Sequence, residues 1–320
     1  MKLAVIFPGQ ASQQVGMGRD FHTEYPVVQD LFNQADEVLG FPLSRIVFEG
    51  PEDELTLTAN AQPAILTVSY AAWKLLEPFI PEDAEITMAG HSLGEYTALV
   101  ASGAIDFADA VRIVNHRGKY MQEAVPVGQG KMAAVIGLPL EKIEEVLVGL
   151  DLGREVAELA NINSPDQIAI SGSAAGIDMA AKPMQDAGAK RFVELKVSAP
   201  FHSSLMIPAA DKLKPELEAV KFNNPRWPVI ANLTAAEYPA DTNEYPDMLY
   251  RQIFSPVHWV ESVQNMAARQ PEGFIEAGPG KVLKMLVAKI SREIPCSGVG
   301  DMNGFKAILA FLSGETGFPC

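Results

Sequence analysis

The sequence predicts an α/β protein in which a smaller unit is inserted into a large domain. A short apolar segment at residues 3–7 leads directly into a glycine-rich loop, as a buried strand at the centre of a sheet would. A second apolar segment, residues 85–89, precedes a glycine-flanked serine and a run of good helix formers. Between residues 130 and 197, strand-like and helix-like segments follow one another in the order β-α-β-β-α-β.

Composition and charge exclude several classes of protein. The chain has 320 residues, 48% hydrophobic and 20% charged, which is enough to bury a large core. The net charge of −15 argues against a nucleic-acid partner, because no basic face is available for the phosphates. Two cysteines and five histidines without metal-ligand spacing predict neither a disulfide framework nor a metal site. Neither a signal-peptide core nor an apolar run of membrane-spanning length occurs, so we expect a cytoplasmic protein.

The glycine-flanked serine is the first candidate for chemistry. Gly90-His91-Ser92-Leu93-Gly94 has the G-x-S-x-G spacing of a sharp turn between a strand and a helix. A serine at such a turn exposes its hydroxyl above the sheet, and the helix N-terminus favours negative charge beside it. The same short sequence also fits a simple turn that caps a helix. The strand-turn-helix context favours Ser92 as a nucleophile.

The glycine-rich loop after the first strand does not fit a nucleotide site. Residues 8–18 lack the G-x-x-x-x-G-K-[ST] pattern, and Gly16 and Gly18 lack the third glycine of the dinucleotide-binding motif. The loop does bring backbone N–H groups to the carboxyl end of a strand, where open α/β sheets bind their ligands.

An arginine interrupts the apolar face of one predicted helix. The helix begins after the capping residue Asp106 and extends to about Val125. Its apolar stripe consists of Phe107, Ala110, Val114 and Met121, and Arg117 lies on the same stripe. A lone charge is costly to bury, so Arg117 should either form a salt bridge, extend to the surface, or serve a function.

Residues 129–197 predict a ferredoxin-like unit between two parts of the large domain, residues 1–128 and 198–320. The expected strands are 131–137, 156–161, 167–171 and 190–197, with helices at 140–150 and 174–187. Pro183 should break the second helix. After this unit, His202 lies in a loop of small residues and follows Ser92 in the chain, as the base of a hydrolase-type serine does. Elimination of the other histidines leaves His202 as the best base, but spacing identifies no acid partner for it.

A series of motifs in a fixed order makes a resemblance specific. The motifs are FPGQ at 7–10, GHSLGEY at 90–96, Arg117, NINSP at 161–165 with ISG at 170–172, APFH at 199–202, RQ at 251–252 with PVHW at 256–259, and EAGPGKVL at 276–283. Over residues 1 to about 300 the chain resembles the malonyl-CoA:acyl carrier protein transacylases, the acyltransferases of bacterial fatty acid synthesis. The resemblance implies an α/β-hydrolase-like large subdomain with an inserted ferredoxin-like small subdomain, and a site in the cleft between them.

The resemblance also implies a role for each site residue. Ser92 would attack the malonyl thioester and His202 would take its proton, with the backbone carbonyl near Gln252 orienting the histidine. The backbone N–H groups of Gln10 and Leu93 would bind the oxyanion.

Further residues would bind the substrate. Arg117 would pair with the malonyl carboxylate, and Phe201, Asn161 and Asn163 would contact the substrate. Phe201 before the histidine resembles the malonyl-selective form of this loop, so α-methyl substrates should be rejected.

The implied reaction is a ping-pong transfer of malonyl from malonyl-CoA to the phosphopantetheine thiol of holo acyl carrier protein. The resemblance implies no bound cofactor, no membrane association and a monomer. Three alternatives stay open: a malonyl transferase that serves a polyketide synthase, a serine thioesterase or hydrolase, and a non-catalytic scaffold that binds the carrier. The sequence departs from the family at Ala11, where glycine is usual, and at Lys131, where a small residue is usual.

Overall fold

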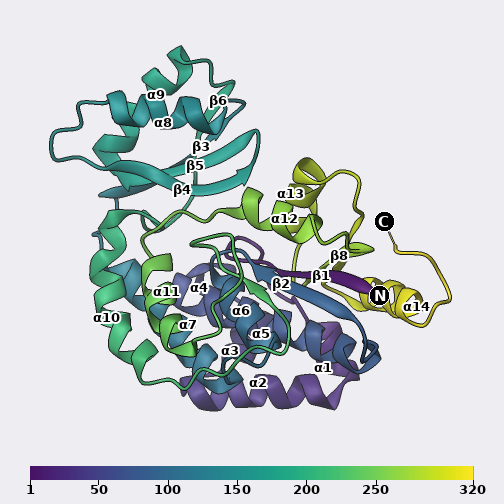
Figure 1. Ribbon diagram of the computed structural model, residues 1–320. Coiled ribbons are helices and arrows are strands. Elements are labelled where there is room, and N and C mark those ends of the chain that lie inside the picture. Colours follow the sequence, from purple (N-terminus) through teal and green to yellow (C-terminus); the bar gives the residue numbers. More distant parts are fainter. Residues whose placement is uncertain (320) are drawn as a thin grey trace.

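The computed structural model describes residues 1–319 and contains two separate β-sheets (Figure 1). The larger sheet has the strand order β7-β2-β1-β8-β9, and its neighbouring strands are all parallel. Its strands are β1 (Lys2–Phe7), β2 (Glu85–Gly90), β7 (Val229–Ile230), β8 (Gly273–Ala277) and β9 (Cys296–Val299). The α/β class predicted from the sequence is confirmed.

The helices cover both faces of this sheet. Those of the N-terminal half are α1 (Arg19–Glu24), α2 (Pro26–Leu39), α3 (Leu43–Glu49), α4 (Glu52–Thr56), α5 (Thr58–Leu76), α6 (Leu93–Ala101) and α7 (Phe107–Glu123). Those of the C-terminal part are α10 (Ile207–Glu218), α11 (Tyr245–Gln252), α12 (Trp259–Ala267), α13 (Val282–Ile290) and α14 (Met302–Leu312). No helix within residues 1–319 has both the length and the apolar character needed to cross a membrane.

Strand β1 separates the two cores of the large subdomain. Leu3, Val5 and Phe7 face the core formed largely with α5, α6 and α7, whereas Ala4 and Ile6 face the core formed with α12 and α13. The side chains of a strand alternate between faces, so an uninterrupted apolar strand is the sequence of a sheet covered on both sides. Because both faces of β1 are buried, the carboxyl ends of β1 and the neighbouring β2 are held in place, and so are the starts of the loops that follow them.

The smaller sheet is antiparallel and has the order β4-β5-β3-β6. It consists of β3 (Gly130–Ile136), β4 (Ala157–Ser164), β5 (Gln167–Ser173) and β6 (Arg191–Glu194), with α8 (Leu140–Gly149) and α9 (Ala174–Asp186) packed on one face (Figure 1). The predicted β-α-β-β-α-β order is confirmed. The exact boundaries of the inserted unit, residues 129 and 197, stay a prediction.

Two predicted elements differ from the structure, and a proline divides the helices after the first loop. Helix α1 ends before Pro26, which lacks an N–H and begins α2. Helix α9 continues through Pro183, which lies in its last turn and whose carbonyl accepts from the N–H of Ala187 at 2.9 Å. The strand expected at 190–197 ends at Glu194, since the chain then leaves the sheet and residues 195–197 line the cavity described below.

Backbone contacts join the loop after β1 to the turn after β2. A Cβ atom added to Gly94 would lie 2.1 Å from the carbonyl oxygen of Phe7, and one added to Gly9 would lie 2.4 Å from that of His91. Only glycine permits such an approach. The first turn of α6 therefore lies directly against the end of β1.

Candidate active site

Ser92 occupies the sharp turn between β2 and α6. Its backbone has φ 51° and ψ −106°, a strained conformation for a residue that carries a side chain. The Oγ atom lies 2.8 Å from Nε2 of His202, which is hydrogen-bond distance. The turn therefore holds the serine hydroxyl against an imidazole, which is the arrangement that activates a serine nucleophile.

His202 is buried, with 3% of its surface exposed, and also has a positive φ of 59°. Its Nδ1 lies 3.0 Å from the carbonyl oxygen of Gln252 and 3.1 Å from that of Ser255. Carbonyl oxygens only accept, so Nδ1 carries the proton and Nε2 is free to accept one from Ser92. Burial, followed by the charge of Arg117 and the proximity of His91, lowers the pKa of His202 to about 3, so the ring is neutral near pH 7.

Arg117 projects from α7 into the same site and has 2% of its surface exposed. It donates from Nη1 to Oε1 of Gln62 at 2.8 Å, and from Nη2 to Oε1 of Gln252 at 3.0 Å and to Oγ of Ser92 at 3.2 Å. Burial lowers its pKa, but a guanidinium stays charged in proteins. Among residues 1–319 no carboxylate lies within 4.0 Å of it, so both structural alternatives, a salt bridge and an extension to the surface, are wrong.

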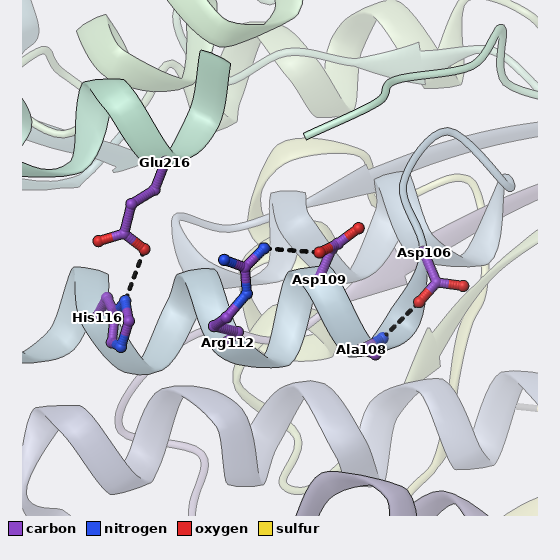
Figure 2. A network of polar contacts seen from close by, with 6 residues as sticks. All are labelled: Asp106, Ala108, Asp109, Arg112, His116 and Glu216. Atoms are coloured by element: carbon purple, nitrogen blue, oxygen red, sulfur yellow. Dashed lines mark hydrogen bonds and ion pairs between the residues drawn. The ribbon is translucent and has the colours of Figure 1, made fainter. Parts of the chain in front are cut away.

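The opposite side of α7 has ordinary polar contacts (Figure 2). Asp106 caps the helix by accepting from the N–H of Ala108 at 2.9 Å, as predicted, and Arg112 pairs with Asp109 at 2.7 Å. His116, the residue before Arg117, lies 2.6 Å from Glu216 of α10. His116 thus has a partly exposed carboxylate as its partner. Its neighbour Arg117 points into a buried site in which no carboxylate of residues 1–319 lies within 4.0 Å of it.

Two backbone N–H groups next to Ser92 have no hydrogen-bond acceptor within residues 1–319. They belong to Gln10, in the loop after β1, and to Leu93, the first residue of α6. The first N–H groups of a helix have no partner inside the helix and commonly bind anions. The Gln10 side chain is held by Thr58, whose Oγ1 lies 3.3 Å from its Nε2.

A polar network that the sequence analysis missed lies beneath the serine. Glu95, with 1% of its surface exposed, accepts from Nε2 of Gln252 at 2.8 Å, from the N–H of Asn232 at 3.2 Å and from the hydroxyl of Tyr238. Burial raises the pKa of Glu95 to about 7, although these donors and Arg117 act in the opposite direction. Glu95 is part of the GHSLGEY motif, and its place in the first turn of the helix after the serine was the available signal.

The site opens into a cavity of about 280 Å³ between the two sheets. The small sheet contributes Asn161 and Asn163 to its lining, and Phe201, with 8% of its surface exposed, lines the large-domain side. Oδ1 of Asn163 accepts from Nε2 of His91 at 2.8 Å, so this asparagine orients a cavity histidine. Burial lowers the pKa of His91, which therefore stays neutral near pH 7.

The two departures from the family pattern have different surroundings. Ala11 has φ 79°, in the left-handed region that favours glycine, and its N–H donates to Oε1 of Gln13 at 2.8 Å. Lys131 lies outside the cavity, where its Nζ is 2.9 Å from Asp178 and 3.3 Å from Glu194. These two carboxylates raise the pKa of Lys131.

A serine and a buried histidine at hydrogen-bond distance, above the edge of a parallel sheet, define a serine-dependent enzyme of the acyl-transfer or hydrolase class. Sequence comparison narrows the class: residues 5–306 match the family of the acyl transferase domain. The chain belongs to this family.

Relatives of known name cover almost the whole chain. It is 44% identical over 317 residues to the malonyl CoA-acyl carrier protein transacylase of Bacillus subtilis, covering 98% of both proteins. It is also 44% identical over 310 residues to the protein of the same name from Escherichia coli strain K12, covering 96% and 99%. The resemblance indicated by the sequence motifs is confirmed.

Solved structures agree. An acyl carrier protein S-malonyltransferase of Vibrio cholerae superimposes with a TM-score of 0.92 at 42% identity, covering 96% of this chain and 100% of the other. A malonyl-transacylase in complex with a type II PKS acyl-carrier protein gives a TM-score of 0.91 at 39% identity, covering 97% and 99%.

Proposed function

We propose that the protein transfers the malonyl group of malonyl-CoA to the phosphopantetheine thiol of holo acyl carrier protein, through a malonyl ester of Ser92. The product, malonyl carrier protein, would supply fatty acid synthesis. The observation that carries the proposal is the buried guanidinium of Arg117, whose Nη2 lies 3.2 Å from Oγ of Ser92 without a carboxylate partner among residues 1–319. The names of the relatives point to the same activity.

In the first half-reaction, Oγ of Ser92 attacks the thioester carbonyl while Nε2 of His202 takes its proton. The negative charge on the carbonyl oxygen is bound by the N–H groups of Gln10 and Leu93, each worth roughly 3 kcal/mol of barrier. The intermediate collapses by breaking the carbon–sulfur bond, and the departing CoA thiolate takes the proton from His202. Because the carbonyls of Gln252 and Ser255 hold Nδ1–H, Nε2 faces the reacting atoms in both proton transfers.

In the second half-reaction the carrier thiol occupies the place that CoA has left. Nε2 of His202 takes the thiol proton as sulfur attacks the ester carbonyl. The same N–H groups bind the second oxyanion, and Ser92 leaves with the proton that His202 returns. The enzyme is thereby restored, and one thioester has been exchanged for another without a bound cofactor.

Arg117 accounts for the choice of acyl group. A malonyl carboxylate can take a charge-assisted, bidentate contact from the guanidinium, whereas an acetyl group leaves this buried charge without a partner. Phe201 and the two asparagines 161 and 163 line the cavity around the acyl group. A methyl branch on the acyl chain would be excluded by packing, a discrimination of about 1–3 kcal/mol.

The carrier protein would approach across the basic rim of the cavity. Lys196 lines the cavity and is exposed, and on the other side Val282 and Leu283 of α13 line it next to the exposed Lys281. A local basic rim would offset the repulsion between an acidic carrier and a chain of net charge −15. We also propose that the protein is a monomer, since every group invoked comes from one chain. Its proposed location is the cytoplasm, as expected from the sequence.

A second candidate function is malonyl transfer to the carrier of a polyketide synthase. One structural relative at 39% identity was solved in complex with a type II PKS acyl-carrier protein, which favours this candidate over the others. A hydrolase would use water in place of the carrier thiol, and a scaffold would bind the carrier without acylation.

The decisive experiment is intact-protein mass spectrometry. The protein is incubated with malonyl-CoA, acetyl-CoA or methylmalonyl-CoA separately, and holo carrier protein of the fatty acid or polyketide type is then added. We expect a malonyl adduct that is absent in Ser92→Ala and is discharged onto the carrier. Steady CoA release without a carrier would instead indicate a hydrolase, and binding without any adduct would indicate a scaffold. The carrier that is acylated faster distinguishes the two pathways.

A further inference from the structure

Glu95 is a buried carboxylate that the proposed reaction does not use. It lies in the first turn of α6, three residues after Ser92, and Tyr238, Gln252 and Asn232 each donate a hydrogen bond to it. All three of these contacts direct a hydrogen at the carboxylate. Removal of its oxygens would leave three buried donors, the Tyr238 hydroxyl, the Asn232 N–H and the Gln252 amide, without this acceptor.

The first consequence concerns the amide of Gln252. Its Nε2 donates to Oε2 of Glu95 at 2.8 Å and to the carbonyl of Ser92 at 2.9 Å, which leaves Oε1 to accept from Arg117 at 3.0 Å. If the amide were reversed, its oxygen would face the carboxylate and its NH₂ group would face the guanidinium. Both contacts would be repulsive, so Glu95, together with the Ser92 carbonyl, determines which end of the amide meets Arg117.

The second consequence concerns the nucleophile itself. Asn232 donates its N–H to Glu95, and its side chain accepts from the N–H of Ser92 at 2.7 Å and donates to the carbonyl of Gly90 at 2.6 Å. One carboxylate therefore supports two connections, one through Asn232 to the strained serine turn and one through Gln252 to the arginine.

We infer that Glu95 is a positioning residue that orients the Gln252 amide and thereby presents Arg117 to the carboxylate of the substrate. This inference rests on the proposed malonyl transfer. Asn232 keeps its own two side-chain bonds to the serine turn when the carboxylate is lost, whereas the Gln252 amide loses one of the two acceptors that hold its NH₂ group away from Arg117. Loss of the carboxylate should therefore impair the use of malonyl more than the use of an acyl group without a carboxylate.

The test variant is Glu95→Leu, which keeps the approximate size of the side chain but removes both acceptor oxygens. Acylation by malonyl-CoA and by acetyl-CoA is followed as the mass adduct on Ser92, over hours where the reaction is slow. We expect the ratio of kcat/KM values, malonyl over acetyl, to fall by about tenfold or more. An equal fall for both substrates, or no fall, would overturn the inference and would show a structural role or none.

The matched control is Glu216→Leu. Glu216 also accepts from two side chains, His116 and Tyr120, away from the active-site cavity. Figure 2 shows its contact with His116. Its ratio should stay at the wild-type value. If Glu95→Leu is recovered unfolded by circular dichroism, Gln252→Met breaks the same connection while keeping Glu95, and its ratio is read in the same way. A malonyl adduct on the wild-type protein keeps the proposed function intact whichever result the variants give.

Discussion

The two sheets contribute differently to the cavity that they enclose. Ser92 and Gln10 follow the ends of adjacent parallel strands, and His202 and Arg117 also come from the large subdomain. The antiparallel sheet contributes residues that line the cavity, such as Asn163. The groups proposed to move protons or bind charge thus all come from one subdomain, while the other limits the space available to the substrate.

Backbone strain shows the same division. Within residues 1–319, the residues other than glycine with a positive φ are Ala11, Ser92, His202, Ala235 and Gln270, and none of them lies in the inserted unit. Three of the five line the active-site cavity. A strained conformation persists only where the surrounding structure enforces it, so the rigid parallel sheet is the part that can hold reactive groups in place.

The largest effect should come from the charged group of the large subdomain. In Arg117→Ala, we expect kcat/KM for acylation by malonyl-CoA to fall by roughly 10³-fold, because the substrate carboxylate is left buried without a partner. Acylation by acetyl-CoA should stay the same or rise, because the charge that an acetyl group leaves without a partner is gone. Arg112→Ala, on the exposed side of the same helix, is the control and should behave as wild type. Equal losses with both substrates would contradict the role given to Arg117.

A smaller effect should appear in the pH dependence of stability. The pKa of His202 is about 3 in the folded protein and near 6.5 when unfolded, so between these values the unfolded state binds more protons. Stability contributed by the neutral ring is therefore complete above pH 6.5 and is lost as the pH falls. Between pH 7 and pH 5 the wild type should lose about 2 kcal/mol more unfolding free energy than His202→Ala.

Urea denaturation of both proteins at the two pH values measures this difference. A constant offset between them would reflect only the cavity left by alanine. Parallel losses in the two proteins would mean that His202 titrates normally in the folded state.

The small sheet should respond weakly to a change in charge. Lys131→Ala removes contacts to Asp178 and Glu194, both of which are largely exposed. We expect the melting temperature to fall by about 1–2 °C and both acylation rates to stay unchanged. A loss of activity would show that the inserted unit contributes to the reaction as well as to the walls of the cavity. It would contradict the view that only the large subdomain supplies the reacting groups.

The smallest effect should be a gain. Ala11→Gly removes a side chain from a backbone with φ 79°, which should relieve about 1 kcal/mol of strain, partly offset by the greater freedom of unfolded glycine. Gly16→Ala is the converse control, because Gly16 has φ 90° and no neighbour within 4 Å of an added Cβ. Thermal melts should move in opposite directions for the two variants. A destabilised Ala11→Gly would mean that this loop has adapted to alanine.

Local sequence patterns predicted the class of the fold, the order of the inserted unit and the candidate groups Ser92, His202 and Arg117. The remaining parts of the site depend on tertiary contacts that no local pattern records. The backbone carbonyl of Ser255, which accepts from His202, could come from any residue type. Asn232 reaches the serine turn from 140 positions along the chain, which spacing alone could not reveal.

The contact between the loop after β1 and the turn after β2 limits how far the spacing of the two proposed anion-binding N–H groups can change. Gln10 and Leu93 belong to segments far apart in sequence, yet Gly9 and Gly94 bring their backbones to van der Waals distance. The gap between the two N–H groups is thus set by carbonyl oxygens pressed against glycine, independently of any side chain at the mouth of the cavity. Substitutions that adapt this scaffold to other acyl groups can therefore reshape the walls of the cavity while the spacing of the two donors stays the same.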